Sequence, residues 1–327
     1  MPTTLTASRA KMMLLSRRDL LASHVTERGV ENLVATGALR RVRRGWYVRN
    51  HEWNDLWSEG RHLLHVLAVH RDERGARPIF SHISAAALWG LPLYRVGIER
   101  AHVTVPEPRR GRSAPDVLRH RGTLNEDEIA EVHGIRVTSL NRTILDLART
   151  LPFEAAVVAA DAALRTIAVR GQRQDEARAA RWREELGALA AESHARGIRT
   201  ARRVIAFADG RAQLPGESVS RVHLARLGFR NIDLQVPVRG PRGENYHVDF
   251  GLEDVPAMGE FDGQFKYTDA AMRGGLSMEE VLLQEKRRED WIRGVTQRPY
   301  VRWEYAHVRT AAGLGRRLAE FGVHPPG

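Results

Sequence analysis

Acidic residues recur on the polar faces of two neighbouring predicted strands in the last third of the sequence. In ENYHVDFGL (244–252), strict alternation leaves Asp249 on the face opposite the apolar residues, which are Tyr246, Val248, Phe250 and Leu252. In AMGEFDGQF (257–265), Glu260 and Asp262 lie opposite Phe261. If the two strands are adjacent, Asp249 and Glu260 can converge. His247 shares the face of Asp249.

Two converging carboxylates repel one another unless a cation lies between them. Hard oxygen ligands select Mg²⁺ or Mn²⁺. Such an ion lowers the pKa of a bound water and neutralises charge on a scissile phosphate. Lys266 follows Glu260 by six residues, close enough to polarise that water. The alternative is an ordinary hairpin with solvated acids.

The elements that must position these residues follow in the order α-β-β-β-α-β-α. The first helix, predicted over 214–229, carries Glu217 in its first turn and Gly228 at its C-terminal end. Strands are predicted over 232–238, 244–252 and 255–265, then a helix over 276–293, a strand over 299–305 and a helix over 310–322.

Residues 214–310 resemble the DUF559/Vsr-like branch of the PD-(D/E)XK nuclease superfamily. The matching segments are GESVSR, LQVPV, YHVDF, GEFDGQFKY, QEKRREDWIR and VRW. The resemblance implies that Asp249 and Glu260 are the main metal ligands and that Glu217 is the helix acid. Asp262 stands where the superfamily has its lysine, so that role must move to Lys266 or Lys286.

The helix QEKRREDWIR (284–293) offers two further candidates, Glu285 and Lys286. Glu285 lies on the apolar stripe formed by Met278, Leu282 and Ile292, and an acid on such a stripe is often paired or functional. The alternative is ordinary pairing one turn apart, such as Lys286 with Asp290, on a solvated face.

Residues 1–50 predict two short helices followed by a β-hairpin. Ser16 and Thr26 can cap the helices, and Gly37 can end the second one. This is the outline of a winged helix-turn-helix, whose second helix would enter the major groove of DNA while its wing touches phosphates. The expected nucleic-acid-binding residues are Arg28, Arg40, Arg41, Arg43 and Arg44. The alternative is a small α/β cap with solvated arginines.

This segment resembles the N-terminal domain of AbiEi-family antitoxins, through Gly37-Ala38-Leu39 and Arg44-Gly45-Trp46-Tyr47. The stretches SHISAAALWGLP (81–92) and VTSLNRTILDLAR (137–149) are similar to the region that follows it in such proteins. The boundaries expected are 1–50 for the winged helix, 51–165 for a mixed α/β middle domain, 166–213 for a helical connector, and 214–327 for the nuclease domain.

Charge and composition limit the class of partner. The formal charge is +11, with a net +7 in residues 1–50 and zero in residues 214–327. A basic surface suits a polyanion such as nucleic acid. No apolar run approaches the ~20 residues of a membrane span, so no membrane partner is expected. Cysteine is absent, which excludes disulfides and thiolate zinc sites and fits a reducing cytoplasm. Of 51 basic residues only three are lysines, which are Lys11, Lys266 and Lys286.

The histidines of the middle domain are unevenly spaced, and we expect them to be structural or surface residues rather than metal ligands. Those concerned are His62, His65, His70 and His82.

The sequence thus predicts a multidomain α/β protein with a winged helix-turn-helix, a mixed middle domain and a restriction-endonuclease-like core. The function expected is a Mg²⁺- or Mn²⁺-dependent DNA endonuclease, linked to toxin–antitoxin or defence systems. The alternative is a non-catalytic DNA-binding regulator or antitoxin with a nuclease-like fold. A toxin partner and a homodimer both remain open.

Overall fold

The structure is a computed structural model that describes residues 5–72, 78–106, 114–193, 195–263 and 277–326. It is a mixed α/β protein with several separate sheets. Two compact units divide the chain: the first holds residues 1–163 and 181–207, and the second holds residues 164–180 and 208–327. The segment expected as a connector, 166–213, is therefore divided between them.

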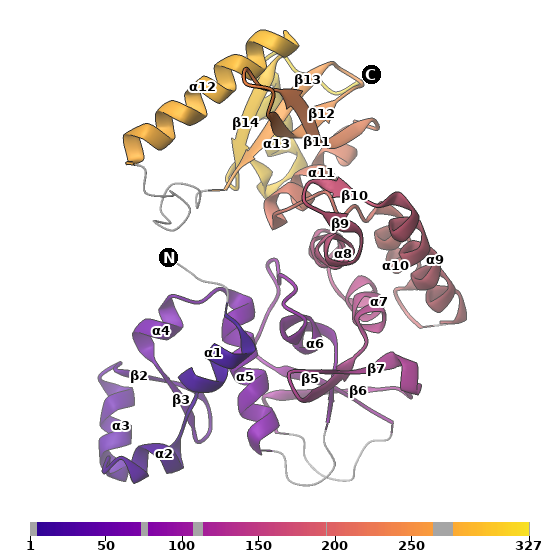
Figure 1. Ribbon diagram of the computed structural model, residues 1–327. Helices are drawn as coiled ribbons and strands as arrows, with labels where there is room; N and C mark the ends of the chain where they lie inside the picture. Colours follow the sequence, from indigo (N-terminus) through magenta and orange to yellow (C-terminus); the bar gives the residue numbers. More distant parts are fainter. Residues whose placement is uncertain (1–4, 73–77, 107–113, 194, 264–276, 327) are drawn as a thin grey trace. The chain divides into compact units, whose positions relative to one another are not determined.

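The first unit begins with helices around a three-stranded sheet of order β1-β3-β2 (Figure 1). Its elements are α1 (Ala7–Met13), β1 (Leu15–Ser16), α2 (Arg17–Ala22), α3 (Glu27–Ala35), β2 (Leu39–Arg43), β3 (Trp46–Arg49), α4 (Asn50–Asn54) and α5 (Ser58–Asp72). The predicted caps are confirmed: Ser16 accepts from Asp19 N and Thr26 from Gly29 N. Gly37 has the left-handed backbone expected of it, with φ +74°.

A five-stranded sheet of order β6-β5-β4-β8-β7 follows, with α6 and α7 against each other. Its elements are β4 (Ile79–Phe80), α6 (His82–Leu88), β5 (Ala101–Val105), β6 (Val117–Arg121), η1 (Glu126–Glu128), β7 (Ile129–Val132), β8 (Ile135–Thr138) and α7 (Leu140–Thr150). β5 pairs in parallel with β6, and β4 with β8. Ser139 caps α7, with its side chain accepting from Arg142 N.

The Ala- and Arg-rich stretch 153–210 is helical, as expected. It forms α8 (Phe153–Ala168), α9 (Glu176–Glu192) and α10 (Ile198–Phe207). Between α8 and α9, the short strands β9 (Val169–Arg170) and β10 (Arg173–Gln174) pair as a hairpin that the sequence reasoning did not foresee.

The second unit contains the predicted α-β-β-β-α-β-α order, and this order is confirmed. The elements are α11 (Pro215–Leu227), β11 (Ile232–Arg239), β12 (Asn245–Leu252), β13 (Ala257–Asp262), α12 (Met278–Thr296), β14 (Tyr300–Glu304), η2 (His307–Arg309) and α13 (Ala311–Ala319). The sheet has the order β11-β12-β13-β14, with β13 and β14 parallel and the other pairs antiparallel.

Two cores form on the two faces of this sheet. On the α12 side, Ile292 packs with Val238, Val248, Met258 and Tyr300. On the α11 side, the Trp303 ring lies 5.2 Å from that of Phe250, and its indole N–H donates to Ser220 of α11 at 2.8 Å. The adjacency of β12 and β13, on which the predicted convergence of acids depends, is present.

The strict alternation predicted for β12 is wrong. Val248 packs toward α12, whereas Phe250 packs on Trp303 on the opposite side, so the two do not share a face. The change of face in β12 occurs at Asp249. Gln235 lies opposite it on β11, and the backbone of Gln235 is left-handed at φ +54°. A residue in that conformation interrupts the pleat, and side chains beyond it change face.

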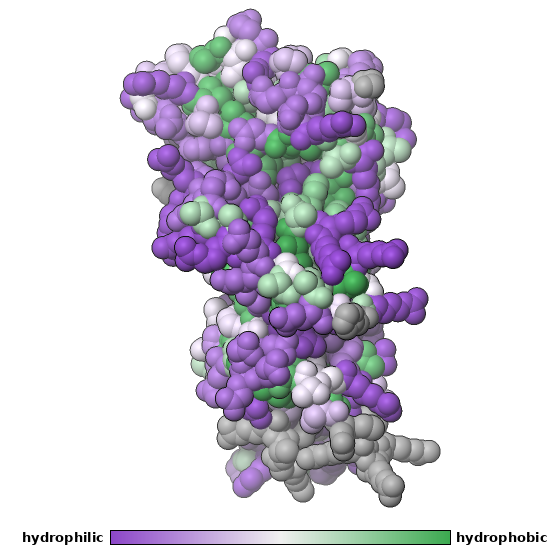
Figure 2. Space-filling model, turned by 90° about the vertical axis from the view of Figure 1, so that its right-hand side faces the viewer, coloured by the Kyte–Doolittle hydropathy of each residue, from purple (hydrophilic) through white to green (hydrophobic). Residues whose placement is uncertain are grey.

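Hydrophilic side chains cover most of the face drawn in Figure 2, with apolar patches between them. Among the described residues, α12 carries four of the exposed large hydrophobic side chains, which are Leu282, Leu283, Trp291 and Val295. Leu282 is 49% exposed, so the apolar stripe predicted for this helix is buried at Ile292 but not at Leu282.

Candidate functional site

Glu217 is a buried acid at the start of α11. Pro215 occupies the first turn, where a missing N–H costs nothing, and Glu217 follows near the positive end of the helix dipole. Its side chain is almost fully buried and accepts a 2.8 Å hydrogen bond from Gln213 N. The predicted helix acid therefore lies inside the unit rather than on its surface.

Gln235 links Glu217 to Asp249. Its amide nitrogen lies 3.3 Å from Glu217 Oε2 and 3.3 Å from Asp249 Oδ1. Gln235 is buried, and a left-handed backbone at a residue other than glycine costs free energy that the surroundings must supply. Sequence reasoning missed this residue, because nothing in IDLQVPV marks a left-handed position.

Asp249 also binds the neighbouring strand. Its Oδ2 accepts a 2.9 Å hydrogen bond from Phe261 N, the backbone group that follows Glu260. Asp249 thus contacts β11 through Gln235 and β13 through Phe261. The two acids assigned as metal ligands, Asp249 and Glu260, lie on adjacent strands at the same level of the sheet.

Glu260 is 1% exposed and is held by an arginine of α12. Arg288 donates to Glu260 Oε1 at 2.6 Å and to the carbonyl of His247 at 2.6 Å. Burial alone would lower the pKa of Arg288, but the hydrogen bond to Glu260 and its negative charge outweigh burial, so the pKa is raised. Burial, and then Glu260, also raise the pKa of Tyr300.

Asp262 is clamped by Arg302 of β14, which donates to both of its carboxylate oxygens, at 2.7 and 2.6 Å. Arg302 also pairs with Glu289 at 3.1 Å, and its Nη2 is 3.9 Å from Glu285. Glu285 is thus directed toward the same group of charges, as the paired interpretation of this acid requires. Sequence reasoning missed both Arg288 and Arg302. For Arg288 the run of charges in QEKRREDWIR was the available signal, whereas Arg302 lies on the next strand, in PYVRWEY.

Of the two candidate lysines, the structure describes only Lys286. Lys266 lies outside the residues that the structure describes. Lys286 is exposed on α12. In the described part of the site, the cations next to the acids are therefore arginines, which cannot act as proton acceptors in proteins.

The acids fit a divalent cation by donor type, since carboxylate oxygens are what Mg²⁺ and Mn²⁺ prefer. Glu217 and Asp249 share one donor, the amide of Gln235, at a point where a cation could take its place. The geometry is incomplete in one respect: within the described residues of this unit, no three carboxylate or histidine ligand atoms lie within 4.8 Å of one another. Of the two acids expected to hold the ion, Asp249 lies at this point, whereas Glu260 is bound to Arg288 of α12.

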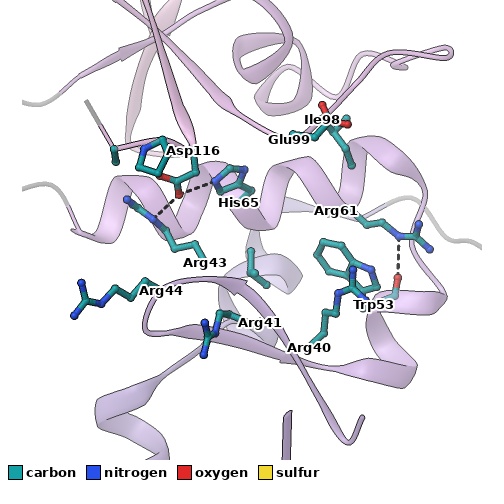
Figure 3. Close-up of a pocket in the computed structure, with 13 residues that line it drawn as sticks. Arg40, Arg41, Arg43, Arg44, Trp53, Arg61, His65, Ile98, Glu99 and Asp116 are labelled. Carbon is teal, nitrogen blue, oxygen red and sulfur yellow. Dashed lines mark hydrogen bonds and ion pairs between the residues drawn. The ribbon is translucent and has the colours of Figure 1, made fainter. Parts of the chain in front are cut away.

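A second candidate region is an arginine-rich pocket of about 740 Å³ in the first unit (Figure 3). Its lining includes Arg40, Arg41, Arg43, Arg44, Arg61 and Trp53. The guanidinium groups of Arg40 and Arg61 each lie 5.6 Å from the ring of Trp53. Such stacking holds a cationic side chain in place while leaving its outer donors available.

Arg43 differs from its neighbours. It pairs with Asp116 at 2.9 Å and Asp72 at 3.2 Å, and Asp116 in turn accepts from His65 (Figure 3). Arg43 is only 14% exposed, whereas Arg40, Arg41 and Arg44 are exposed on β2 and the turn that follows it. Arg28 is exposed on α3. The geometry therefore favours a structural role for Arg43 and leaves the other four arginines available to a polyanion.

No protein-family model matches this chain. Two curated relatives come from Mycobacterium tuberculosis: Uncharacterized protein MT2308 of strain CDC 1551 / Oshkosh and Uncharacterized protein Rv2248 of strain H37Rv. Each is 34% identical over 134 residues, which are 41% of this chain and 45% of the relative. The chain thus matches less than half the length of either relative, and neither name states a function.

Within the described residues, no helix combines the length and apolar character needed to cross a bilayer.

Proposed function

We propose that this protein is a divalent-metal-dependent endonuclease that binds DNA through its own winged helix-turn-helix. We infer that residues 5–49 form the winged helix and that residues 215–319 form a PD-(D/E)XK core. The first inference is supported by helices α2 and α3, which pack with the β2–β3 hairpin in one hydrophobic cluster. The second is supported by three antiparallel strands followed by a parallel one, flanked by α11 and α12.

The observation that carries the proposal is the meeting of Glu217, Gln235 and Asp249. Two acids from different elements point at one amide nitrogen, 3.3 Å from each, and the backbone of Gln235 is strained at that point. Strained backbone and converging buried acids are costly for a fold and concentrate at functional sites.

In this reaction the chain's own residues would do three things. Asp249 and Glu260 would hold the ion, which lowers the pKa of water and offsets charge on the phosphate. Arg288, released from Glu260, would place positive charge beside the scissile group. The exposed arginines of β2 would hold the DNA backbone, because each phosphate contact releases counterions.

A second function, a non-catalytic DNA-binding regulator or antitoxin, is favoured by a different observation. Arg288 already neutralises Glu260, and Arg302 already neutralises Asp262, so the described site balances these charges without an ion. A nuclease-like fold that has lost catalysis would keep such pairs, because a buried acid without its partner destabilises the fold. In that case binding to a toxin encoded nearby, rather than cleavage, would be its activity.

The deciding experiment incubates the full chain with plasmid and with single- and double-stranded oligonucleotides, in Mg²⁺, Mn²⁺ or EDTA. We expect cleavage with either ion and none in EDTA. Asp249→Asn and Glu260→Gln should abolish cleavage, while the exposed acid variant Glu320→Gln keeps it. DNA binding without cleavage in any ion would reject the nuclease and leave the regulator. Cleavage of equal rate in Asp249→Asn would place the chemistry elsewhere.

A further inference from the structure

Three histidines from three elements meet in the first unit. His82 begins α6, His102 lies on β5 and His120 on β6. One ligand atom from each histidine lies within 4.8 Å of the other two. Among the described residues, no other group of three or more histidine or carboxylate ligands meets this spacing. Sequence spacing could not show it, because His102 and His120 come together only through the parallel pairing of β5 with β6.

Two of the three rings already have their nitrogens at the spacing of a shared ion. Nδ1 of His102 and Nε2 of His120 are 3.1 Å apart and share a hydrogen bond. Two nitrogens bound to one tetrahedral zinc at about 2.0–2.1 Å are separated by roughly 3.3 Å, close to that spacing. Nδ1 of His82 is 3.1 Å from Ser81 Oγ and 3.9 Å from Asp146 Oδ2, which leaves its Nε2 as the ligand atom.

Metal-bound histidines usually have polar groups around the nitrogen that does not bind the ion. For His82, Ser81 Oγ is hydrogen-bonded to this nitrogen and the Asp146 carboxylate lies behind it. Asp146 is 1% exposed, and both of its oxygens accept from Arg142 at 3.1 Å. The arginines near the histidines are themselves paired or solvated. Arg142 binds Glu128 and Asp146, Arg149 binds Asp146, and Arg100 is exposed. Their repulsion of a cation is therefore reduced.

Imidazole binds metal in its neutral form. His82 is buried, whereas His102 and His120 are partly exposed, which gives an ion a way in from solvent.

We propose that His82, His102 and His120 bind one Zn²⁺ ion and leave its fourth position open to water or an anion. Three imidazoles suit zinc rather than Mg²⁺ or Mn²⁺, which take oxygen ligands. The site uses none of the acids proposed for cleavage, so it stands or falls independently of the nuclease.

Zinc binding requires one movement. The rings of His82 and His120 are stacked, with centroids 3.6 Å apart and planes 14° from parallel. An ion lies in the plane of each imidazole that binds it, so both rings cannot reach one ion while stacked. His82 must tilt away from His120. Its backbone is left-handed at φ +51°, a further strain at this position.

The test uses tag-free full-length protein, stripped with EDTA and dialysed against Zn²⁺, with bound metal measured by elemental mass spectrometry. We expect one zinc per chain in the wild type. His102→Gln and His120→Gln, checked for native circular dichroism, should each lose it, and the exposed variant His51→Gln should keep it. Asp146→Asn should weaken binding about 10–100-fold. Co²⁺ in place of zinc should give a tetrahedral visible spectrum.

Further measurements distinguish the histidine site from the acidic residues proposed for cleavage. Asp249→Asn and Glu260→Gln should keep their zinc, and the imidazole proton resonances of His82 should shift on zinc addition. Retention of zinc by both folded histidine variants would overturn the proposal, as would its loss only in the acid variants. Absence of zinc from the wild type would leave the cluster as packing.

Discussion

Arg288 of α12 donates a 2.6 Å hydrogen bond to the carboxylate of Glu260 on β13, and Glu260 is almost completely buried. This pair joins the long helix to the sheet at the centre of the candidate site. A buried ion pair adds little net stability over apolar residues, but removing one partner leaves an uncompensated charge.

Arg288→Met should therefore destabilise the second unit by about 3–5 kcal/mol. Adding Glu260→Gln should recover part of the loss, because the stranded charge is gone. Urea denaturation would measure both. The matched control is Arg178→Met, since Arg178 and its partner Asp175 are 54% and 47% exposed and such pairs contribute about 0–1 kcal/mol. Equal losses in Arg288→Met and Arg178→Met would contradict the buried-pair argument.

The wing arginines should separate into two kinds. Arg41→Ala and Arg44→Ala should each lower the slope of log K against log salt by about 0.9, because each removes one phosphate contact. Arg43→Ala should instead lower thermal stability, since Asp72 and Asp116 lose their partner. Fluorescence anisotropy over a salt series and thermal melts would check this. An unchanged slope in both exposed variants means that the wing does not touch the DNA backbone.

Two glycines of the second unit should respond in opposite ways to alanine. A Cβ at Gly259 would lie 2.3 Å from the Trp303 ring, whereas a Cβ at Gly294 meets nothing within 4 Å. Gly259→Ala should cost about 1–3 kcal/mol through overpacking. Gly294→Ala, within α12, should gain about 0.5–1 kcal/mol from lower chain entropy. Thermal melting of the two variants tests the packing of β13 on β14; a stable Gly259→Ala would refute it.

The free energy of unfolding of the first unit should decrease as the pH is lowered. Burial lowers the pKa of His62 to about 3, from 6.5 in the unfolded chain. Between these values the unfolded state holds the extra proton, so stability is fully present above pH 6.5 and declines toward pH 3. One proton gives a slope of up to about 1.4 kcal/mol per pH unit. Metal-free protein unfolded at pH 7 to 4 would show it. His62→Gln should reduce the slope by up to about 1.4 kcal/mol per pH unit. The remaining slope comes from His82, His102 and His120, whose pKa values burial also lowers. The exposed variant His51→Gln should leave the slope unchanged.

If cleavage is found, the two lysines can be compared directly. Lys266→Met should reduce the single-turnover rate by about 10²–10⁴-fold, the usual contribution of a positioned acid–base group. Lys286→Met should cost less, because Lys286 is exposed on α12. The reverse order would assign the lysine role to the helix, and no effect from either would mean that the site uses no lysine.

Local features of this chain followed from the sequence. Ser16 and Thr26 cap helices where a hydroxyl precedes a helical run, and Gly37 and Gly228 take left-handed backbones after one. The α-β-β-β-α-β-α order of residues 215–319 also followed, as did the adjacency of the strands carrying Asp249 and Glu260. Capping, turn chemistry and hydrophobic period act over a few residues, so the sequence alone determines them.

Only the tertiary structure decided which charges meet. Arg288 reaches Glu260 across 28 positions, and Arg302 reaches Asp262 across 40. His82, His102 and His120 converge because of parallel pairing in a sheet. Gln235 takes a left-handed backbone on β11, opposite the point where the side chains of β12 change face. These relationships depend on the register and packing of distant segments. Side-chain period alone cannot encode them, because it says which residues of one strand share a face but not which distant strands become neighbours.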